Sequence, residues 1–339
     1  MKTIVGFMAI DAPASALNNA GAEPGAATEN TVAIKKITTR YGVFPYVSAQ
    51  AVRYWWRQTL QMKFSWNMSP ITREAKNAFT EANPFTYPDD DLFGYMVAKK
   101  IEVEEKGKKK SKNVTVTRIS PLKNSPLVSV SPVKIVDDFG VMARQEGDAV
   151  PFEHQFAQCI FKGIFSLDVD QAGTFSYINR TGYQNIREEM LANYKKQSNV
   201  TIDEEKKCVK LNIQEKQKRI QDVISAIPYL FGGAKQTLHL TNVSPSLLVL
   251  VLYNGGNHIL ANLMQDNKGI PTFSIDALHK IAEDYETDLL SKIYIGRLEG
   301  FMDDLKEPLA SLGKDSKFQV GTPKSVVDAF CAEILNKIE

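Results

Sequence analysis

One predicted helix places two arginines and a glutamine on the same face. Gln50, Arg53 and Arg57 are spaced i, i+3 and i+7, and Ser48 is suited to cap the N-terminus of a helix that runs to about Met62. Guanidinium groups match phosphate oxygens, and the N–H groups at a helix N-terminus attract anions. The pattern predicts a face that holds a phosphate backbone without reading bases, although two arginines on a helix are also typical of a solvated surface.

Charge is unevenly distributed along the 339 residues, although the net charge is only +2. Residues 99–123 contain nine Lys or Arg against three Glu, whereas residues 276–307 contain nine Asp or Glu against four Lys or Arg. Such asymmetry fits a surface that binds a polyanion, or self-association of basic against acidic surfaces. The lysine-rich segment 106–112 fits a solvated hairpin tip equally well.

Catalytic and metal-binding patterns are absent from the sequence. There is no glycine-rich phosphate or dinucleotide motif and no nucleophile elbow, and the four histidines are scattered. Asp89, Asp90 and Asp91 are consecutive, which fits a helix cap better than a cation site. We therefore expect a chain that is not an enzyme and that uses no metal or cofactor.

The cysteines and the apolar segments indicate a cytoplasmic protein. Three cysteines, far apart in the sequence, fit a reducing compartment and form no disulfide framework. The longest apolar run, Leu247–Tyr253, is far shorter than the roughly 20 residues that a membrane helix needs. The N-terminal segment Lys2–Ile10 fits a buried strand better than a secretory signal, so no membrane association is expected.

Hydrophobic periodicity predicts an α+β fold with long insertions between core elements. The sequence predicts a loop over 11–29, a helical insertion over 70–88, a hairpin over 92–119, a protruding loop over 137–151 and helical structure over 185–226. It also predicts a buried strand over 247–253, an amphipathic helix over 275–290 and a closing helix over 325–337.

The sequence resembles the DevR branch of the Cas-seven family, whose members are the multi-copy backbone subunits of type I-B CRISPR surveillance (Cascade) complexes. The resemblance covers roughly residues 1–260 in order. It is carried by Asn18-Asn19, residues 29–39, Phe44–Arg53, Asp91–Met96, Ser120-Pro-Leu, residues 125–129 and Gly232-Gly-Ala-Lys235-Gln236.

The resemblance implies a modified RRM (ferredoxin-like) palm with a helical fingers insertion and a β-hairpin thumb. The implied palm is discontinuous, the fingers are mainly helical, and the lysine-rich hairpin is an elaboration that the family does not explain. The expected boundaries are 1–62, 91–135, 158–184 and 232–339 for the palm, 63–90 and 185–231 for the fingers, 99–118 for the lysine-rich hairpin and 133–156 for the thumb.

The resemblance also implies a set of RNA-binding residues. Ser48, Gln50, Arg53 and Arg57 fall on the helix that binds the guide backbone, and Asn19 falls on the preceding loop. A glycine loop with Lys235 and Gln236 closes over the guide. Met96 wedges against bases, and Phe139 and Met142 lie beside a displaced nucleotide, unless they form a loop tip packed on the body.

The leading hypothesis is a non-catalytic crRNA-binding subunit that polymerises along the guide and presents it for pairing with target DNA. Its implied partners are crRNA, target DNA, further copies of itself, and Cascade subunits of the Cas-five, Cas-six and Cas-eight types. One alternative is a metal-dependent, target-RNA-cleaving subunit of the type III kind, with Asp11, Asp89 or Asp91 as its catalytic aspartate. Another is a scaffold protein unrelated to nucleic acid.

Overall fold

The computed structural model describes residues 1–22, 31–74, 77–105, 108–144, 146–180, 182–188, 191–194 and 199–338. The strands are β1 (Lys2–Ser15), β2 (Asn19–Ala22), β3 (Thr31–Ile34), β4 (Lys36–Thr39), β5 (Gly42–Val47), β6 (Thr72–Glu74), β7 (Asn77–Phe79), β8 (Tyr95–Glu105), β9 (Lys108–Arg118), β10 (Leu122–Asn124), β11 (Leu127–Ser129), β12 (Val136–Met142), β13 (Val150–Asp168), β14 (Thr174–Ser176), β15 (Val200–Asp203), β16 (Cys208–Leu211), β17 (Leu247–Asn254), β18 (Met264–Asn267), β19 (Ile270–Phe273), β20 (Ile293–Arg297) and β21 (Phe318–Gly321). The α-helices are α1 (Ala49–Phe64), α2 (Pro88–Phe93), α3 (Leu191–Tyr194), α4 (Ile213–Ser225), α5 (Gln236–His239), α6 (Ile275–Asp284), α7 (Lys306–Leu312) and α8 (Pro323–Ile334).

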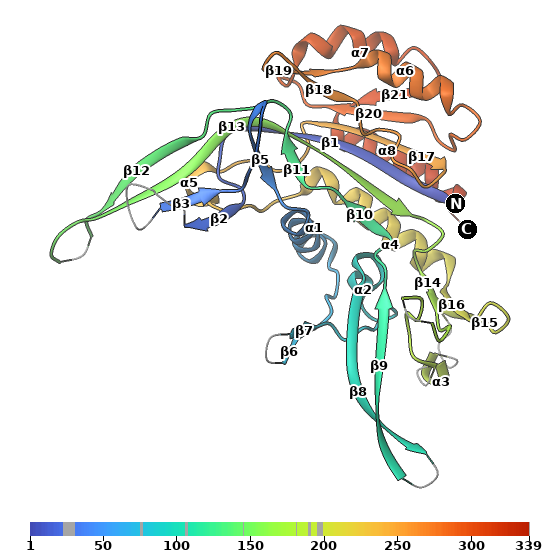
Figure 1. Ribbon diagram of the computed structural model, residues 1–339. Helices are drawn as coiled ribbons and strands as arrows, with labels where there is room; N and C mark the ends of the chain where they lie inside the picture. Colours follow the sequence, from blue (N-terminus) through green and yellow to red (C-terminus); the bar gives the residue numbers. More distant parts are fainter. Residues whose placement is uncertain are drawn as a thin grey trace.

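A large mixed sheet organises the molecule (Figure 1). Its main path runs β21-β20-β17-β1-β13-β11-β5-β4. The central strand β1 pairs antiparallel with β13 on one side and with β17 on the other, whereas β20 and β21 run parallel. This mixed α+β arrangement agrees with the expected fold class at that level.

The central strands are buried on both faces because their apolar residues alternate between two cores. Ile4 and Met8 on β1 contribute to the core beneath α1, α4 and α8. Val5 and Phe7, which alternate with them, contribute to the opposite core beneath α6 and α7. Alternation with a period of two on one strand therefore supplies both layers of packing.

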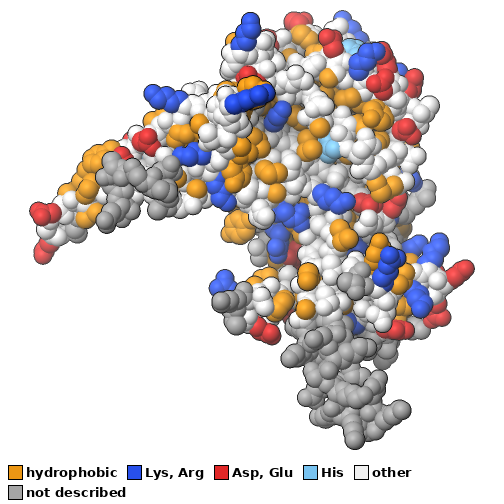
Figure 2. All heavy atoms as spheres, in the orientation of Figure 1, with side chains coloured by type: hydrophobic (Ala, Val, Ile, Leu, Met, Phe, Trp, Pro, Cys, Tyr) orange, Lys and Arg blue, Asp and Glu red, His pale blue; other side chains and the backbone are white. Residues whose placement is uncertain are grey.

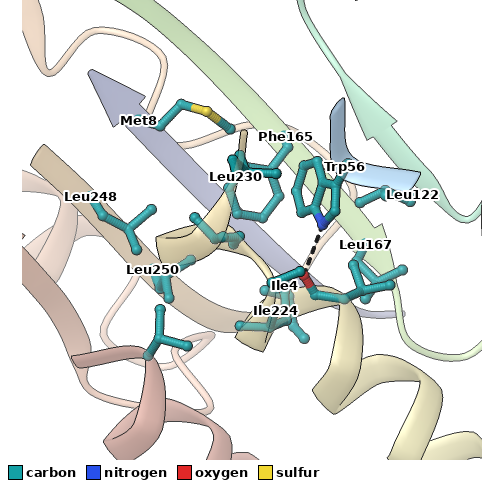
Figure 3. Packing of buried hydrophobic residues seen from close by; sticks show 14 of the residues in the cluster. Ile4, Met8, Trp56, Leu122, Phe165, Leu167, Ile224, Leu230, Leu248 and Leu250 are labelled. Carbon is teal, nitrogen blue, oxygen red and sulfur yellow. Dashed lines mark hydrogen bonds between the residues drawn. The ribbon is translucent and has the colours of Figure 1, made fainter. Parts of the chain in front are cut away.

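Trp56 of α1 occupies the centre of the first core (Figure 3). Its ring meets the ring of Phe165 edge to face, with centroids 5.2 Å apart. Its Nε1 donates to the carbonyl of Val223 on α4 at 2.9 Å, so the only polar atom of this buried side chain is satisfied. These contacts join α1 to both β13 and α4.

Two hairpins extend from this body (Figure 1). One is formed by β8 and β9, which pair from Tyr95↔Arg118 outward. The other is formed by β12 and the first part of β13, which pair from Val136↔Phe156 to Met142↔Val150. The rest of β13 continues into the central sheet, so this second hairpin, called the arm below, is an outward extension of a core strand.

A buried cluster of aspartates and arginines, called the acid hub below, anchors the β8–β9 hairpin to the body. Asp91 of α2 is fully buried and pairs with Arg118 at the end of β9 and with Arg219 of α4. The same carboxylate also accepts the backbone N–H of Gly173. One side chain therefore joins α2, the hairpin, α4 and the turn before β14, and its charge is matched within the cluster.

The arm is anchored near α5 by two histidines. His154 of β13 lies 3.3 Å from Asp138 of β12, and its ring centroid lies 5.7 Å from that of His239 on α5. Burial lowers the pKa of His239, and His154 and Lys235 lower it further, whereas Asp138 acts in the opposite direction. The fold therefore favours the neutral form of His239.

The two expected helical fingers insertions differ from the structure. Residues 63–90 contain the strand pair β6–β7 and the start of α2, and residues 185–231 contain β15 and β16 as well as α3 and α4. The second segment is rich in charged residues, which suggested helices, but its apolar residues Val209 and Leu211 alternate along β16. They pack in a hydrophobic cluster beside the main core. Helix α4 packs in the main core through Ile220 and Ile224.

Several other expectations are settled by the element bounds. The helix capped by Ser48, the hairpin over 92–119 and the buried strand over 247–253 are confirmed. The loop predicted over 137–151 is wrong at both ends, since β12 runs to Met142 and β13 begins at Val150, and the helix predicted over 275–290 ends at Asp284. Part of the loop predicted over 11–29 is strand, and residues 23–30 lie outside the described residues. Within the described residues, no helix has the length and apolar character needed to cross a membrane.

Replacing Asp91 tests the acid hub. Asp91→Asn removes the carboxylate paired with buried Arg118 and one of the two carboxylates paired with Arg219, which keeps Glu215, so we expect a loss of about 3–5 kcal/mol in the free energy of unfolding, measured by urea denaturation. Asp284→Asn, at an exposed position of α6, serves as the control and should change it by less than about 0.5 kcal/mol. Equal effects of the two substitutions would show that the hub does not hold the fold together.

The lowered pKa of His239 predicts a loss of stability in acid. Because the folded pKa lies below the ordinary value of 6.5, the unfolded chain binds more protons once the pH drops below that value. The stability that neutral His239 contributes to the free energy of unfolding is thus fully present above pH 6.5, and it is lost as the pH falls through the folded pKa. Urea unfolding at pH 7.5 and pH 5 should show a smaller acid-induced loss for His239→Gln than for the unsubstituted chain, and identical losses would contradict this account.

Candidate nucleic-acid interface

Three segments meet at the turn between β1 and β2. The carbonyl of Leu17 accepts the N–H of Ala234 in the glycine loop at 2.9 Å. The side-chain oxygen of Asn18 accepts the N–H of Ser48 at 2.9 Å, and its carbonyl accepts the N–H of Lys35 at the same distance. Asn18 therefore positions the N-terminus of α1 beside the glycine loop.

The first turn of α1 presents polar groups without any acidic side chain. Ser48 caps the helix through its hydroxyl, which accepts the N–H of Ala51 at 3.3 Å, and Gln50 is exposed. No acidic residue lies in this turn, so the positive end of the helix dipole has no carboxylate on its own helix to offset it. The side-chain oxygen of the neighbouring Asn19 is buried and has no hydrogen-bond partner among the described residues. This end of the helix is suited to an anion.

The glycine loop lies against α1 because Gly232 carries no side chain. A Cβ at Gly232 would come within 2.3 Å of the Trp55 ring, and its φ of +139° is one that other residues rarely adopt. Gln236 closes the loop by donating from Nε2 to the carbonyls of Gly232 and Thr241. Lys235 follows this loop, which is tied to Leu17 and packs against Trp55 of α1.

Arg53 makes internal contacts that the helical pattern did not predict. Its guanidinium donates to the carbonyl of Leu122 at 2.8 Å, to the carbonyl of Phe93 at 2.6 Å and to the hydroxyl of Ser120 at 3.0 Å. Burial lowers the pKa of Arg53 to about 10, with a further contribution from Arg57. Arg53 therefore joins α1 to the segments on both sides of the β8–β9 hairpin.

Arg57 also contacts the protein, although part of its side chain remains accessible. Its Nη2 lies 2.7 Å from the buried carboxylate of Asp89, which also accepts the N–H of Ser69. About a third of the Arg57 side chain is exposed. The face of α1 that carries Arg53 and Arg57 therefore serves largely to attach α1 to α2 and to the base of the β8–β9 hairpin.

The remaining predicted residues lie on the two hairpins rather than at the α1 N-terminus. Met96 is 68% exposed near the base of β8. Phe139 and Met142 lie on β12 and are 61% and 57% exposed, so they do not form a tip packed on the body. Figure 2 shows hydrophobic side chains along the arm, and Lys and Arg side chains in the angle between the arm and the body.

Sequence reasoning missed Asp91, Arg118 and Arg219 as a group. They come from three segments separated by up to 128 residues in the sequence, and no local spacing connects them. The only available signal was the run of three aspartates, which sequence analysis interpreted as a cap or a cation site. Asp89 and Asp91 are instead paired with arginines, and the described residues contain no group of three His, Cys, Asp or Glu side chains that could hold a metal.

One protein-family profile matches the chain. The chain matches the profile of a family described as "CRISPR-associated negative auto-regulator DevR/Csa2" over residues 8–268. No curated protein sequence matches it.

Two solved structures have a similar fold. One chain comes from a "CRISPR RNA-guided surveillance complex", with a TM-score of 0.51, 11% identity, and coverage of 97% of this chain and 98% of that one. Another comes from a "CRISPR RNA-guided surveillance complex, pre-nicking", with a TM-score of 0.57, 12% identity, and coverage of 97% and 99%. The family match extends over most of the sequence and includes the whole α1–glycine-loop junction, and on that basis the chain belongs to the DevR/Csa2 family of CRISPR-associated proteins.

Proposed function

We propose that this protein is a crRNA-binding backbone subunit of a type I-B CRISPR surveillance complex. Several copies assemble along the guide RNA and hold its sugar-phosphate backbone, so that the bases remain available to pair with target DNA. The two solved chains of similar fold come from RNA-guided surveillance complexes, which supports this assignment. Contacts with other Cascade subunits and a cytoplasmic location belong to the same proposal.

The observation that carries the proposal is the convergence of three loops at the N-terminus of α1. The residues that we assign to this site lie at or next to the segments that meet there: Asn19 begins β2, Ser48 and Gln50 lie at the start of α1, and Lys235 and Gln236 lie at the start of α5. The first turn of α1 contains no acid, and a helix end of this kind binds phosphates irrespective of base sequence. A guide whose sequence varies requires binding of that kind.

We assign different tasks to the two arginines of α1. Arg57, about a third of whose side chain is exposed, contributes to backbone binding, whereas Arg53 is a positioning residue because its contacts are with Leu122, Phe93 and Ser120. Met96 at the hairpin base is assigned to contact with bases. The arm acts as the thumb, with Phe139 and Met142 beside a displaced nucleotide.

No second function is proposed. A type III-like nuclease would need an available catalytic aspartate, but Asp89 and Asp91 are buried and paired with Arg57, Arg118 and Arg219. Asp11 is classed as exposed, although the burial of part of its carboxyl group raises its pKa. Among the described residues it belongs to no group of acidic, histidine or cysteine side chains that could hold a metal ion.

The helix end can be tested by substituting Gln50 and Lys235 together, since neither side chain forms part of the acid hub. Gln50→Ala with Lys235→Gln should weaken binding of single-stranded RNA of any sequence. The plot of log affinity against log salt should lose about 0.7 of its slope, the amount expected for one lost phosphate contact. Fluorescence anisotropy across a salt series measures both quantities.

The matched control is Gln265→Ala with Lys268→Gln at the β18–β19 turn, where Lys268 has nearly the same φ as Lys235, 53° against 54°. This control pair removes one side-chain amide and one ammonium group, as the Gln50–Lys235 pair does, but from the β18–β19 hairpin. If the control pair weakens RNA binding as much as the Gln50–Lys235 pair, the proposed helix-end site is wrong.

The arm can be tested by truncating its exposed apolar side chains. Phe139→Ala with Met142→Ala should leave the unfolding midpoint nearly unchanged, because both side chains are exposed. It should also disturb the regular spacing of protected nucleotides in the assembled complex, measured by nuclease footprinting. Ile71→Ala with Ile270→Ala removes exposed apolar groups elsewhere and should keep the spacing, whereas an unchanged footprint in the arm variant would exclude the thumb role.

A further inference from the structure

Large apolar side chains are exposed along helix α1. Tyr54 is 60% exposed and Met62 is 72% exposed, and both belong to the helix itself. Tyr229, at the end of the short 3-10 helix that follows α4, is 36% exposed, and the Lys63 ammonium lies 3.9 Å from the centre of its ring. Single exposed apolar residues need no explanation, but several of them along one helix indicate a surface that binds a partner.

Tyr54 lies among polar groups on the solvent-facing side of α1. Gln50 precedes it by four residues, and Arg57 and Gln58 follow it by three and four, so all three are its neighbours on the helix surface. Gln58 donates from Nε2 to the Tyr54 hydroxyl at 2.8 Å, which restrains the ring. More than half of this tyrosine is therefore accessible, and it lies between Gln50 and Arg57, the two side chains of α1 that we assign to the RNA backbone.

The charge of α1 favours an anionic strand at this face. The helix contains Arg53, Arg57 and Lys63, and it contains no Asp or Glu. In Figure 1, α1 lies in the angle between the arm and the β8–β9 hairpin, and Figure 2 shows Lys and Arg side chains there. Aromatic side chains beside cationic groups are the recurring features of sites for single-stranded nucleic acid.

We propose that Tyr54 is a stacking platform for one base of single-stranded RNA. The proposal rests on the function proposed above, because a phosphate of the same strand is held at the N-terminus of α1. At a rise of 1.5 Å per residue, Tyr54 lies about 9 Å along the helix axis from the capping Ser48. A strand that runs from the helix end along α1 therefore meets this ring after the first turn.

Stacking on Tyr54 differs from phosphate binding in what it recognises. Every base has a π-face, so an aromatic platform accepts any sequence, as a guide of variable sequence requires. The tyrosine ring carries no charge, so its removal leaves the number of neutralised phosphates unchanged. One stacked base for each copy of the protein leaves the neighbouring bases available to pair with target DNA.

Truncation of the ring tests the proposal on the full chain freed of nucleic acid. In fluorescence anisotropy with a short single-stranded RNA, Tyr54→Ala should raise the dissociation constant at least about fivefold at every salt concentration, the lower limit for one stacked base. The slope of log affinity against log salt should stay the same. Tyr54→Trp keeps an aromatic platform and should bind within about twofold of the unsubstituted chain.

The matched control is Tyr183→Ala. Tyr183 is 55% exposed in the segment after β14, and the guanidinium carbon of Arg180 lies 4.4 Å from the centre of its ring, so this site too combines an accessible tyrosine with a cation. The control should change the dissociation constant less than about twofold, because it removes no stacked base. Equal weakening by the Tyr54 and Tyr183 substitutions would overturn the proposal. Unchanged affinity in Tyr54→Ala would also overturn it and would leave the exposed ring to a protein partner.

A strand whose bases are replaced by abasic ribose units separates this proposal from the proposed function. Tyr54→Ala and the unsubstituted chain should bind that strand equally, whereas the Gln50–Lys235 variant should still bind it more weakly. A loss in Tyr54→Ala that persists on the abasic strand would place the tyrosine on the RNA backbone and contradict stacking. If the Gln50–Lys235 substitutions have no effect while Tyr54→Ala weakens binding only of the strand with bases, the helix-end phosphate site is wrong and the stacking site stands.

Discussion

A single buried carboxylate, Asp91, determines how the parts of this molecule are joined. Two arginines from distant segments, Arg118 and Arg219, converge on it, so α2, the β8–β9 hairpin and α4 take fixed positions relative to one another. Removing one partner from such a buried cluster leaves an uncompensated charge, which is far more costly than the loss of an exposed ion pair. The anchor adds to a small apolar cluster at the base of the hairpin, which among the described residues includes Tyr95 and Val116.

Helix α1 connects this anchor to the proposed function. Its apolar face, including Trp56, packs into the main core, while Arg53 attaches it to the hairpin base and Arg57 attaches it to Asp89 of α2. Its first turn, capped by Ser48, contains no acidic residue, and the glycine loop lies against its Trp55. Because α1 is fixed by its packing in the core, the surface at its N-terminus, where we propose that RNA binds, is held rigid. A rigid surface binds the RNA backbone at a smaller entropic cost.

Local patterns predicted the elements whose signals are local. The Ser48 cap and the apolar stripe of α1 depend on neighbours within a few residues, and the uninterrupted apolar run of β17 can form only a buried segment. The β12 strand was missed because its residues are exposed on both faces, which leaves no alternation to detect. The roles of Arg53 and Asp91 depend on carbonyls and charges that folding brings together, and spacing in the sequence carries no information about them.

The central claim is that copies of this protein assemble along a guide RNA. The most direct measurement is to express the chain together with a CRISPR transcript, purify it, and determine by size-exclusion chromatography and RNA sizing what elutes with it after nuclease treatment. The account predicts an assembly of several copies that protects RNA of discrete length. A protein that elutes as a monomer and protects no RNA would contradict it.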